Sequence, residues 1–357
     1  MDGNFREAAA PESLGSGSGW GAAGAPAHLG AARTPSGGFV LVGLAADGGE
    51  RFRLPLPDRG HAAAVHPSRP LAVAFARRPG TFGLVVDCLE GREVARLETP
   101  QGVHFMGHGC ISADGARLYT PENDYGRGRG ILGVWDAADW RRLGEVPSGG
   151  LGPHDVIEMA DGVLAVANGG IFTDPAMERQ KLNLGSMRPN LVYLDPDAGR
   201  VLEAVAPEAR QASLRHIAMR ADGTIAAAMQ WEGEAARAPA VLALHRRGEA
   251  LRPLSAPGDA QARLKGYGGS VAFSGDGGLA VVTSPRGGVA HLFDVASGAF
   301  AAQIEQPDVC GAAPAGPGLL LSDGMGWLRW IGSDGAEVRR RETPGLAWDN
   351  HLVRVAA

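Results

Sequence analysis

Cysteine is scarce in this chain of 357 residues. The three cysteines are Cys88, Cys110 and Cys310, and no two of them have CxxC spacing. An odd number of cysteines without that spacing predicts neither a disulfide framework nor a zinc knuckle.

Long apolar runs and an excess of positive charge are also lacking. No stretch of about 18 apolar residues occurs, so we expect no membrane span. The net charge of −5 does not indicate the excess of basic residues that binds a polyanion, so we expect no nucleic-acid partner. Residues 1–35 are rich in Gly, Ala, Ser and Pro, but contain no basic stretch followed by an apolar one. That segment is not a signal peptide as it stands, and we expect a flexible N-terminal tail over residues 1–37.

The familiar catalytic motifs are missing as well. The sequence contains no GxSxG, P-loop, HExxH or convincing dinucleotide fingerprint. Gly107-x-Gly109 leads into a predicted strand rather than a helix, so it fails the dinucleotide test. The sequence therefore identifies no catalytic residue.

Glycine and proline, by contrast, are abundant and evenly spread. The 54 glycines and 24 prolines separate short apolar runs, and hydrophobic residues make up 45% of the chain. That distribution is typical of an all-β protein with many turns. No helix-rich segment is visible, which disfavours an α/β fold.

A strand–turn–strand pattern recurs along the chain. Asp-Gly pairs between apolar runs are strong hairpin signals, and they occur at Asp114, Asp222 and Asp276. A polar residue precedes each of these Asp residues by six positions, namely His108, His216 and Ser270 in turn. His154 precedes Asp161 by seven positions.

The recurring pattern divides the chain into units of four short strands. Six units cover residues 59–100, 103–147, 152–206, 214–256, 268–306 and 309–343. A hairpin at 38–57 and a last strand at 348–355 are left over, and together they predict a seventh unit that closes a ring. Repeats of this length indicate a β-propeller. We therefore expect one seven-bladed propeller of four-stranded blades over residues 38–357. Eight blades remain an alternative if the insertion at 171–190 contains strands.

The start of each unit carries a polar side chain. In a propeller the first strand of each blade lines the central channel, so these side chains should meet at one mouth of it. Imidazole suits Fe, Cu and Zn, and thiolate is also a metal ligand. The candidate ligands of such a transition metal are His61, His108, His154, His216, Cys310 and His351.

Loops at the same end should add further polar groups to a funnel, where propellers usually bind their ligands. The predicted funnel residues are Arg59, Glu122, Asp124, Asp155, Asn168, Arg215, Gln230, Ser270, Arg286, Asp323 and Asn350. The alternative is that the histidines have only structural roles. The spacing of seven at His154 could also turn its side chain to the other face of the strand, because side chains alternate with a period of two.

Several strings resemble an uncharacterised bacterial propeller family, a domain of unknown function, over residues 38–355. They include Arg59-Gly-His-Ala-Ala-Ala-Val-His-Pro, Tyr119-Thr-Pro-Glu-Asn-Asp, Gly152-Pro-His-Asp and Trp348-Asp-Asn-His-Leu. Members are often encoded beside imelysin-like and di-haem-peroxidase-like proteins of iron uptake, and many carry a twin-arginine export signal. The resemblance implies a periplasmic protein linked to iron uptake, with imelysin-like proteins as partners. This chain lacks the twin-arginine segment.

Three functions follow from these observations. The first is a monomeric, non-catalytic propeller that binds a transition metal or a metal-related ligand in a histidine-lined funnel. The second is a lactonase-like hydrolase, in which a metal with Glu122, Asp124 or Asn168 activates water. The third is a scaffold for protein interactions in which the histidines are structural.

Overall fold

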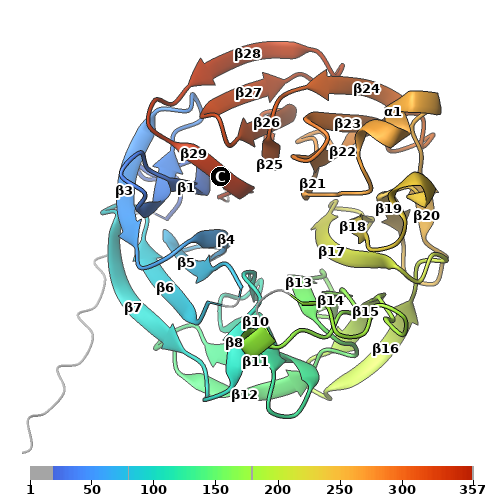
Figure 1. The fold of residues 1–357 in the computed structure, drawn as a ribbon. Coiled ribbons are helices and arrows are strands. Elements are labelled where there is room, and N and C mark those ends of the chain that lie inside the picture. The colour runs from blue at the N-terminus through green and yellow to red at the C-terminus, as the bar shows by residue number, and fades with distance from the viewer. Residues whose placement is uncertain (1–18, 79, 178–179, 356–357) are drawn as a thin grey trace, which may run out of the picture.

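The computed structural model describes residues 19–78, 80–177 and 180–355. Seven antiparallel sheets are arranged around a central channel, as Figure 1 shows. The predicted seven-bladed β-propeller is therefore confirmed.

The blades are numbered here in the order in which the chain forms them. Blade 1 contains β1 (His28–Arg33), β2 (Phe39–Leu44), β3 (Glu50–Leu56) and β29 (Ala347–Arg354). Blade 2 contains β4 (Gly60–Val65), β5 (Leu71–Ala76), β6 (Phe82–Asp87) and β7 (Arg92–Glu98). Blade 3 contains β8 (Val103–Phe105), β9 (Cys110–Ile111), β10 (Arg117–Asp124), β11 (Arg129–Asp136) and β12 (Arg142–Pro147). Blade 4 contains β13 (Pro153–Glu158), β14 (Leu164–Asn168), β15 (Asn190–Asp195) and β16 (Arg200–Val205).

Blades 5 to 7 follow the same plan. Blade 5 contains β17 (Ala212–Met219), β18 (Ile225–Trp231), β19 (Leu242–His245) and β20 (Arg252–Leu254). Blade 6 contains β21 (Ser270–Phe273), β22 (Leu279–Ser284), β23 (Val289–Asp294) and β24 (Phe300–Glu305). Blade 7 contains β25 (Val309–Ala315), β26 (Gly318–Asp323), β27 (Trp327–Ile331) and β28 (Glu337–Glu342).

Blade 1 closes the ring with strands from both ends of the chain, but it corrects the predicted boundary at residue 38. Strand β1 lies between β29 and β2, within the predicted tail of residues 1–37. Trp20 is buried in the same core. The Gly- and Ala-rich composition concealed the strand, because small residues suit a crowded site. A side chain at Gly30 would meet Trp348 and Leu352 at 3.0 to 3.2 Å. Residues 1–18 of the predicted tail lie outside the described residues.

The hydrophobic core lies between neighbouring blades rather than at the centre of the ring. Each of the seven blade interfaces has its own cluster of buried apolar side chains, including the one between blades 7 and 1. Middle strands such as β5 are buried along their whole length, whereas outer strands such as β7 are largely exposed. A strand covered on both faces reads as a continuous apolar run, which explains the pattern Leu-Ala-Val-Ala-Phe-Ala in β5.

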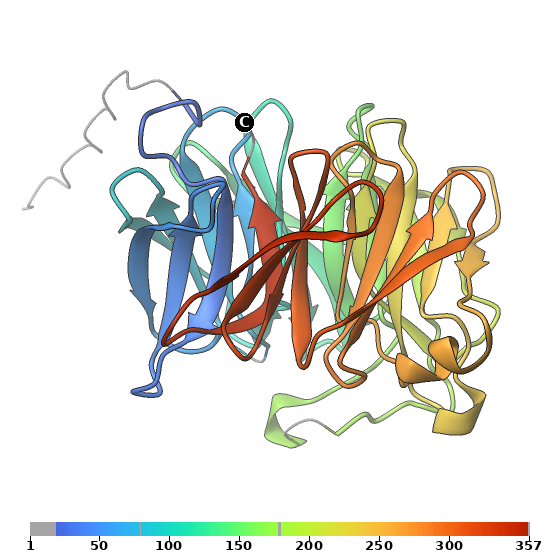
Figure 2. The ribbon, with the colours of Figure 1, turned by 90° about the horizontal axis from the view of Figure 1, so that it is seen from above.

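The innermost strands all begin at one end of the channel. The loop between β14 and β15, which holds the predicted insertion 171–190, lies at that end, and so does the link from β20 to β21 with α1 (Gly258–Arg263). We call this the insertion end; in Figure 2 the light-green loop and the orange helix α1 project together from it. The first and last described residues, 19 and 355, lie toward the opposite end.

The insertion adds no blade. Its described residues contain one short helix, η1 (Pro175–Met177), and no strand, while residues 178 and 179 lie outside the described part. A second short helix, η2 (Ala235–Arg237), follows β18. No helix in the described part of the chain has the length and apolarity needed to cross a membrane.

Deleting residues 1–37 should destabilise the propeller strongly, because β29 and β2 would lose the strand between them. The deletion removes the buried side chains of Leu29, Ala31 and Ala32 and both of the β1 ladders. We expect the melting temperature, followed by circular dichroism, to fall by about 10 °C or more. A chain that lacks only residues 1–18 keeps every described strand and is the control. Equal melting temperatures for the two chains would contradict this role of β1.

Candidate metal centre

Irregularities in the innermost strands place the histidines. In β4, Gly60 pairs with Ala76 and Ala63 with Ala74, so His61 lies in a bulge. The register of β13 skips His154 in the same way. A β-bulge adds an unpaired residue and redirects its side chain. The spacing of seven at His154 thus reflects a bulge, and it does not remove His154 from the cluster.

The other three histidines occupy similar interruptions. The residues of β29 between Trp348 and Leu352, which include His351, lie opposite a single residue of β1. His216 follows a bulge in β17. His108 lies in the gap between β8 and β9, the two halves of the innermost strand of blade 3.

Gly107 allows His61 and His108 to share this space. It has a φ of +97°, and a Cβ atom at this position would come within 2.5 Å of the His61 ring. Only glycine combines a positive φ with the absence of a Cβ atom that would clash with the ring. The Gly-His-Gly string is therefore a requirement of packing around the histidines.

The five imidazoles meet inside the channel. Their ring centroids are as close as 4.4 Å, between His216 and His351, and the longest of the contacts, between His61 and His216, is 6.2 Å. All five side chains are buried, with residue exposures between 3% and 7%. The structure thus brings together the histidines that open five of the blades. Their assignment as metal ligands stays a prediction.

Two groups of three within the cluster have a geometry that could hold a metal ion. One is His61, His108 and His351, and the other is His108, His154 and His216; within each group the candidate ligand atoms lie within 4.8 Å of one another. Nitrogens bound to zinc at 2.0–2.1 Å in a tetrahedron are about 3.3 Å apart. The side chains would therefore close in slightly around an ion. His108 belongs to both groups.

Each of the five rings has one buried nitrogen without a hydrogen-bond partner among the described residues. These atoms are Nδ1 of His61, Nε2 of His108, Nδ1 of His154, Nδ1 of His216 and Nε2 of His351. Buried polar atoms nearly always have a partner, so five such nitrogens in one place indicate a missing ligand.

Burial keeps four of the five imidazoles neutral. It lowers the pKa of His61 to about 4, against a partly opposing effect of Asp349. Burial lowers the pKa of His154, His216 and His351 well below the usual value, and neighbouring imidazoles lower it further. A neutral imidazole nitrogen is the form that binds a metal. These four imidazoles can therefore bind a cation near neutral pH without first losing protons.

Two carboxylates lie behind the rings. Asp155 Oδ1 is 3.3 Å from His108 Nδ1, and Asp349 Oδ1 is 3.6 Å from His61 Nδ1. The second distance is too long for a hydrogen bond, which agrees with the lack of a bonded partner for His61 Nδ1. Burial raises the pKa of Asp349, but the His61 ring and the Arg59 guanidinium outweigh it and hold the pKa well below its usual range.

A cavity of about 270 Å³ adjoins the cluster in the channel. Its lining includes His108, His216 and His351 together with Asp155 and Ser270. Ser270 Oγ is 3.5 Å from His351 Nδ1. A small ligand could therefore reach the imidazoles from this side.

Cys310 is not brought into either group of ligands. Its Sγ lies 3.4 Å from the carbonyl oxygen of Trp348 and 3.1 Å from that of Asp349, inside the core between blades 7 and 1. A bulge after Val309 turns the side chain toward β29. Burial raises the pKa of the thiol, which keeps it protonated. The structure therefore places Cys310 as a small core residue, contrary to the prediction of a ligand.

Four predicted funnel residues bond within or between blades instead. Glu122 bonds to Arg142 and Thr120 inside blade 3, where burial raises its pKa. Asp124 pairs with Arg127 and Arg129. The Asn168 side chain donates to the carbonyl of Ser148. Asp323 accepts hydrogen bonds from Gln306, Met325 and Trp327.

The remaining funnel residues lie closer to the cluster. Arg59 pairs with Asp349, whose carboxylate also accepts the backbone N–H of Asn350. Arg215 precedes His216 and is buried. Arg286 stacks on the ring of Tyr267 at 4.3 Å, and Gln230 donates to the Gly268 carbonyl in the same region.

Asp349 and Arg77 were missed by the sequence analysis. Asp349 precedes His351 by two residues, and this spacing was the available signal. Arg77 is close enough for its charge to lower the pKa of His61 and His351. Arg77 lies in the loop after β5, and nothing in a loop sequence shows whether an arginine is close to the channel.

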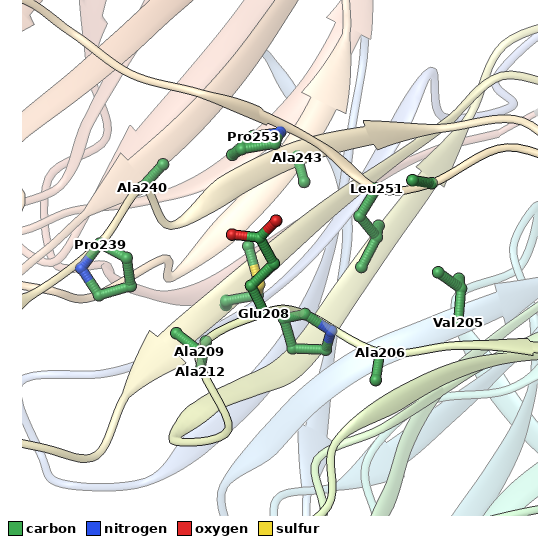
Figure 3. Close-up of a pocket in the computed structure, with 13 residues that line it drawn as sticks. Val205, Ala206, Glu208, Ala209, Ala212, Pro239, Ala240, Ala243, Leu251 and Pro253 are labelled. Atoms are coloured by element: carbon green, nitrogen blue, oxygen red, sulfur yellow. The ribbon is translucent and has the colours of Figure 1, made fainter.

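An apolar hollow of about 180 Å³ lies elsewhere, in blades 4 and 5. Figure 3 shows Leu251, Pro253, Pro239 and Val205 around it, with Glu208 as the one charged lining residue. Its lining contains no imidazole and no group of metal-binding side chains.

The metal-free protein should lose stability as the pH falls from 6.5 to about 4. The pKa of His61 is lowered in the folded state, so in this window the unfolded chain binds more protons and the free energy of unfolding falls with pH. His61 alone accounts for roughly 3 kcal/mol at the lower limit. Urea unfolding followed by tryptophan fluorescence measures the slope, which should be shallower in His61→Gln. Identical slopes for the two proteins would rule out a buried neutral His61.

Two solved structures share the fold. The Kuenenia stuttgartiensis hydrazine synthase chain has a TM-score of 0.58 and 16% identity, with 90% of this chain and 97% of that chain covered. The BamB protein from Moraxella catarrhalis has a TM-score of 0.53 and 12% identity, with 88% and 83% covered. At such identities the likeness shows the fold alone. Among the curated proteins, no sequence matches this chain significantly.

One family model covers most of the propeller. It matches residues 54–355, which span every histidine of the cluster, blades 2 to 7 and strand β29 of blade 1. The chain therefore belongs to the family described as "Protein of unknown function (DUF1513)".

Proposed function

We propose that this protein binds a transition-metal ion through the five-histidine cluster in its channel. The observation that carries the proposal is the set of five buried ring nitrogens without partners, from five different blades. Leaving such groups unpaired costs free energy, roughly 1–3 kcal/mol for each one. A bound cation would offset that cost at all of the nitrogens it reaches.

The chemistry of the donors narrows the choice of metal. Both groups consist of imidazoles, with neither carboxylate nor thiolate among the candidate ligands in the described part of the chain. Imidazole suits Fe, Cu and Zn, whereas Mg and Ca require oxygen ligands. Affinity at a nitrogen site generally rises from Fe²⁺ to Cu²⁺ and falls again at Zn²⁺. The identity of the physiological metal depends also on which metal is available to the protein.

The carboxylates behind the rings support this function. Metal-binding histidines usually donate the second ring N–H to a carboxylate or carbonyl, which fixes the ring and makes it a better ligand. Asp155 has this relation to His108, and Asp349 lies near His61. Asp155 is itself held by the backbone N–H groups of Val156 and Ile217, from two different blades.

Non-catalytic binding fits the site better than hydrolysis. Glu122, Asp124 and Asn168, the candidates for activating water, are bonded at sheet positions away from the imidazoles. We also propose that the protein acts in the periplasm and cooperates with imelysin-like proteins of iron uptake. That part of the proposal rests on the family resemblance, and detection of the protein in a periplasmic fraction would test the location.

Replacing His108 should reduce metal binding more than replacing any other histidine, because His108 belongs to both groups. We expect His108→Ala to weaken Zn²⁺ or Cu²⁺ binding by more than about 100-fold, and His154→Ala to weaken it less. Equilibrium dialysis with elemental analysis should give about one ion per chain for the unaltered protein.

His104→Ala provides the control for these variants. The His104 ring packs on Tyr125 outside the cluster, so this variant should bind metal normally. No bound Fe, Cu or Zn in the unaltered protein would contradict the proposed function, as would equal binding by the His104 and His108 variants.

Asp349→Asn should weaken metal binding without abolishing it. The substitution keeps the shape of the side chain but removes the negative charge 3.6 Å from His61. Loss of such an outer partner typically costs 10- to 100-fold in affinity. Calorimetric titration with Zn²⁺ measures the change. An unaltered affinity would mean that His61 is not among the ligands.

A further inference from the structure

Arginine side chains surround the insertion end of the histidine cluster. Arg59 pairs with Asp349 behind His61. The charge of Arg77 acts on His61 and His351, and that of Arg215 acts on His154 and His216. Positive charges are thus close to four of the five imidazoles. They would repel a cation bound there without an accompanying anion.

Arg215 is incompletely neutralised. It is only 3% exposed, and its Nε has no hydrogen-bond partner among the residues that the structure describes. Its counter-ion is Glu232, at 3.8 Å from Nη2, and Glu232 also binds Lys181. A buried guanidinium with a free N–H and a distant carboxylate is costly. An added anion would relieve that cost.

Arg78 adds a second positive charge near Arg215. It lies in the loop after β5 of blade 2, whereas Arg215 is on β17 of blade 5, and the two are close enough for repulsion to act between them. Burial first, and then this neighbouring charge, lowers the pKa of Arg215 to about 10. Two guanidiniums from blades well separated in the ring therefore approach each other near the cluster.

A bound metal would make the imbalance larger. Near the insertion end, the basic side chains include Arg59, Arg77, Arg78, Arg215 and Lys181, and the acidic ones include Asp349, Glu232, Asp308 and Asp323. All the candidate ligands are imidazoles, so none of them would supply a negative charge to balance a divalent ion.

We propose that a small carboxylate anion completes the site, bound between the histidine-held metal and the guanidinium of Arg215. A planar carboxylate matches the donor geometry of arginine and also provides an oxygen for a metal. This inference rests on the proposed function, since the anion needs the metal as its second anchor. The protein would then bind a metal together with an organic acid rather than the bare ion.

Spectral titration of the Cu²⁺-loaded protein tests the proposal. The protein is first loaded in chloride buffer, and then acetate, propionate or inorganic phosphate is added while the visible absorption of the copper is recorded. We expect a saturable change with the carboxylates. No response to any anion would overturn the inference, and a response to phosphate alone would overturn the assignment to carboxylates. Failure of Cu²⁺ to bind in chloride buffer would instead remove the proposed function, and this inference with it.

Variants connect the response to Arg215. Arg215→Gln should bind Cu²⁺ more tightly in chloride buffer, because a nearby positive charge is gone, and should lose at least about 10-fold in carboxylate affinity. Arg215→Lys retains the charge and should keep part of the carboxylate affinity. This variant replaces Arg215→Gln in the experiment if Arg215→Gln does not fold. Arg263→Gln is the matched control, since Arg263 lies on α1 at the same end but pairs with Glu305 at the surface. An equal loss in the control variant would overturn the role of Arg215.

Discussion

The five imidazoles are packed against one another without enough hydrogen-bond partners for their nitrogens, and this constraint governs the rest of the structure. They are buried and within a few ångströms of each other, and each has a nitrogen with no hydrogen bond among the described residues. In a protein interior such an arrangement lowers stability unless something binds it. In the function proposed above, a bound metal ion would supply the interaction that the polypeptide does not provide.

The propeller makes this arrangement possible because the stability of the ring lies elsewhere. Seven apolar clusters join neighbouring blades, and the strands of blade 1 close the circle. The innermost strands can therefore be bulged or divided, as β4, β13 and the pair β8 and β9 are, without loss of the fold. Each irregularity turns a polar side chain toward the channel. The rigid blades then hold those side chains at fixed positions around it.

Periodicity in the sequence was enough to predict the architecture. Asp-Gly turns and continuous apolar runs in the middle strands come from local geometry and burial, so they appear in the sequence at regular intervals. Strand β1 was missed because its residues are mostly small and lie in a Gly- and Ala-rich segment. The composition of this segment predicted a flexible tail, whereas the close packing of Gly30 against Trp348 explains why small residues are needed in the strand.

The site was predictable only in part. The position of each histidine at the start of a blade predicted that the rings would converge, and they do. The same argument failed for Cys310 and Glu122, because their orientation depends on a bulge and on a buried partner, Arg142. Neither the bulge nor the buried partner can be recognised from the alternation of polar and apolar residues along a strand. Asp349 and Arg77 became visible only when segments distant in the chain were brought together in space.

X-ray absorption at the zinc edge of the zinc-loaded protein tests the central claim most directly, since it reports the atoms that surround the ion. The account predicts a first shell of nitrogens at about 2.0–2.1 Å with the outer-shell scattering of at least three imidazole rings, and room for a light-atom ligand besides. A first shell of oxygens without the imidazole signature would contradict it. In that case the histidine cluster would be a feature of packing and the metal would bind elsewhere.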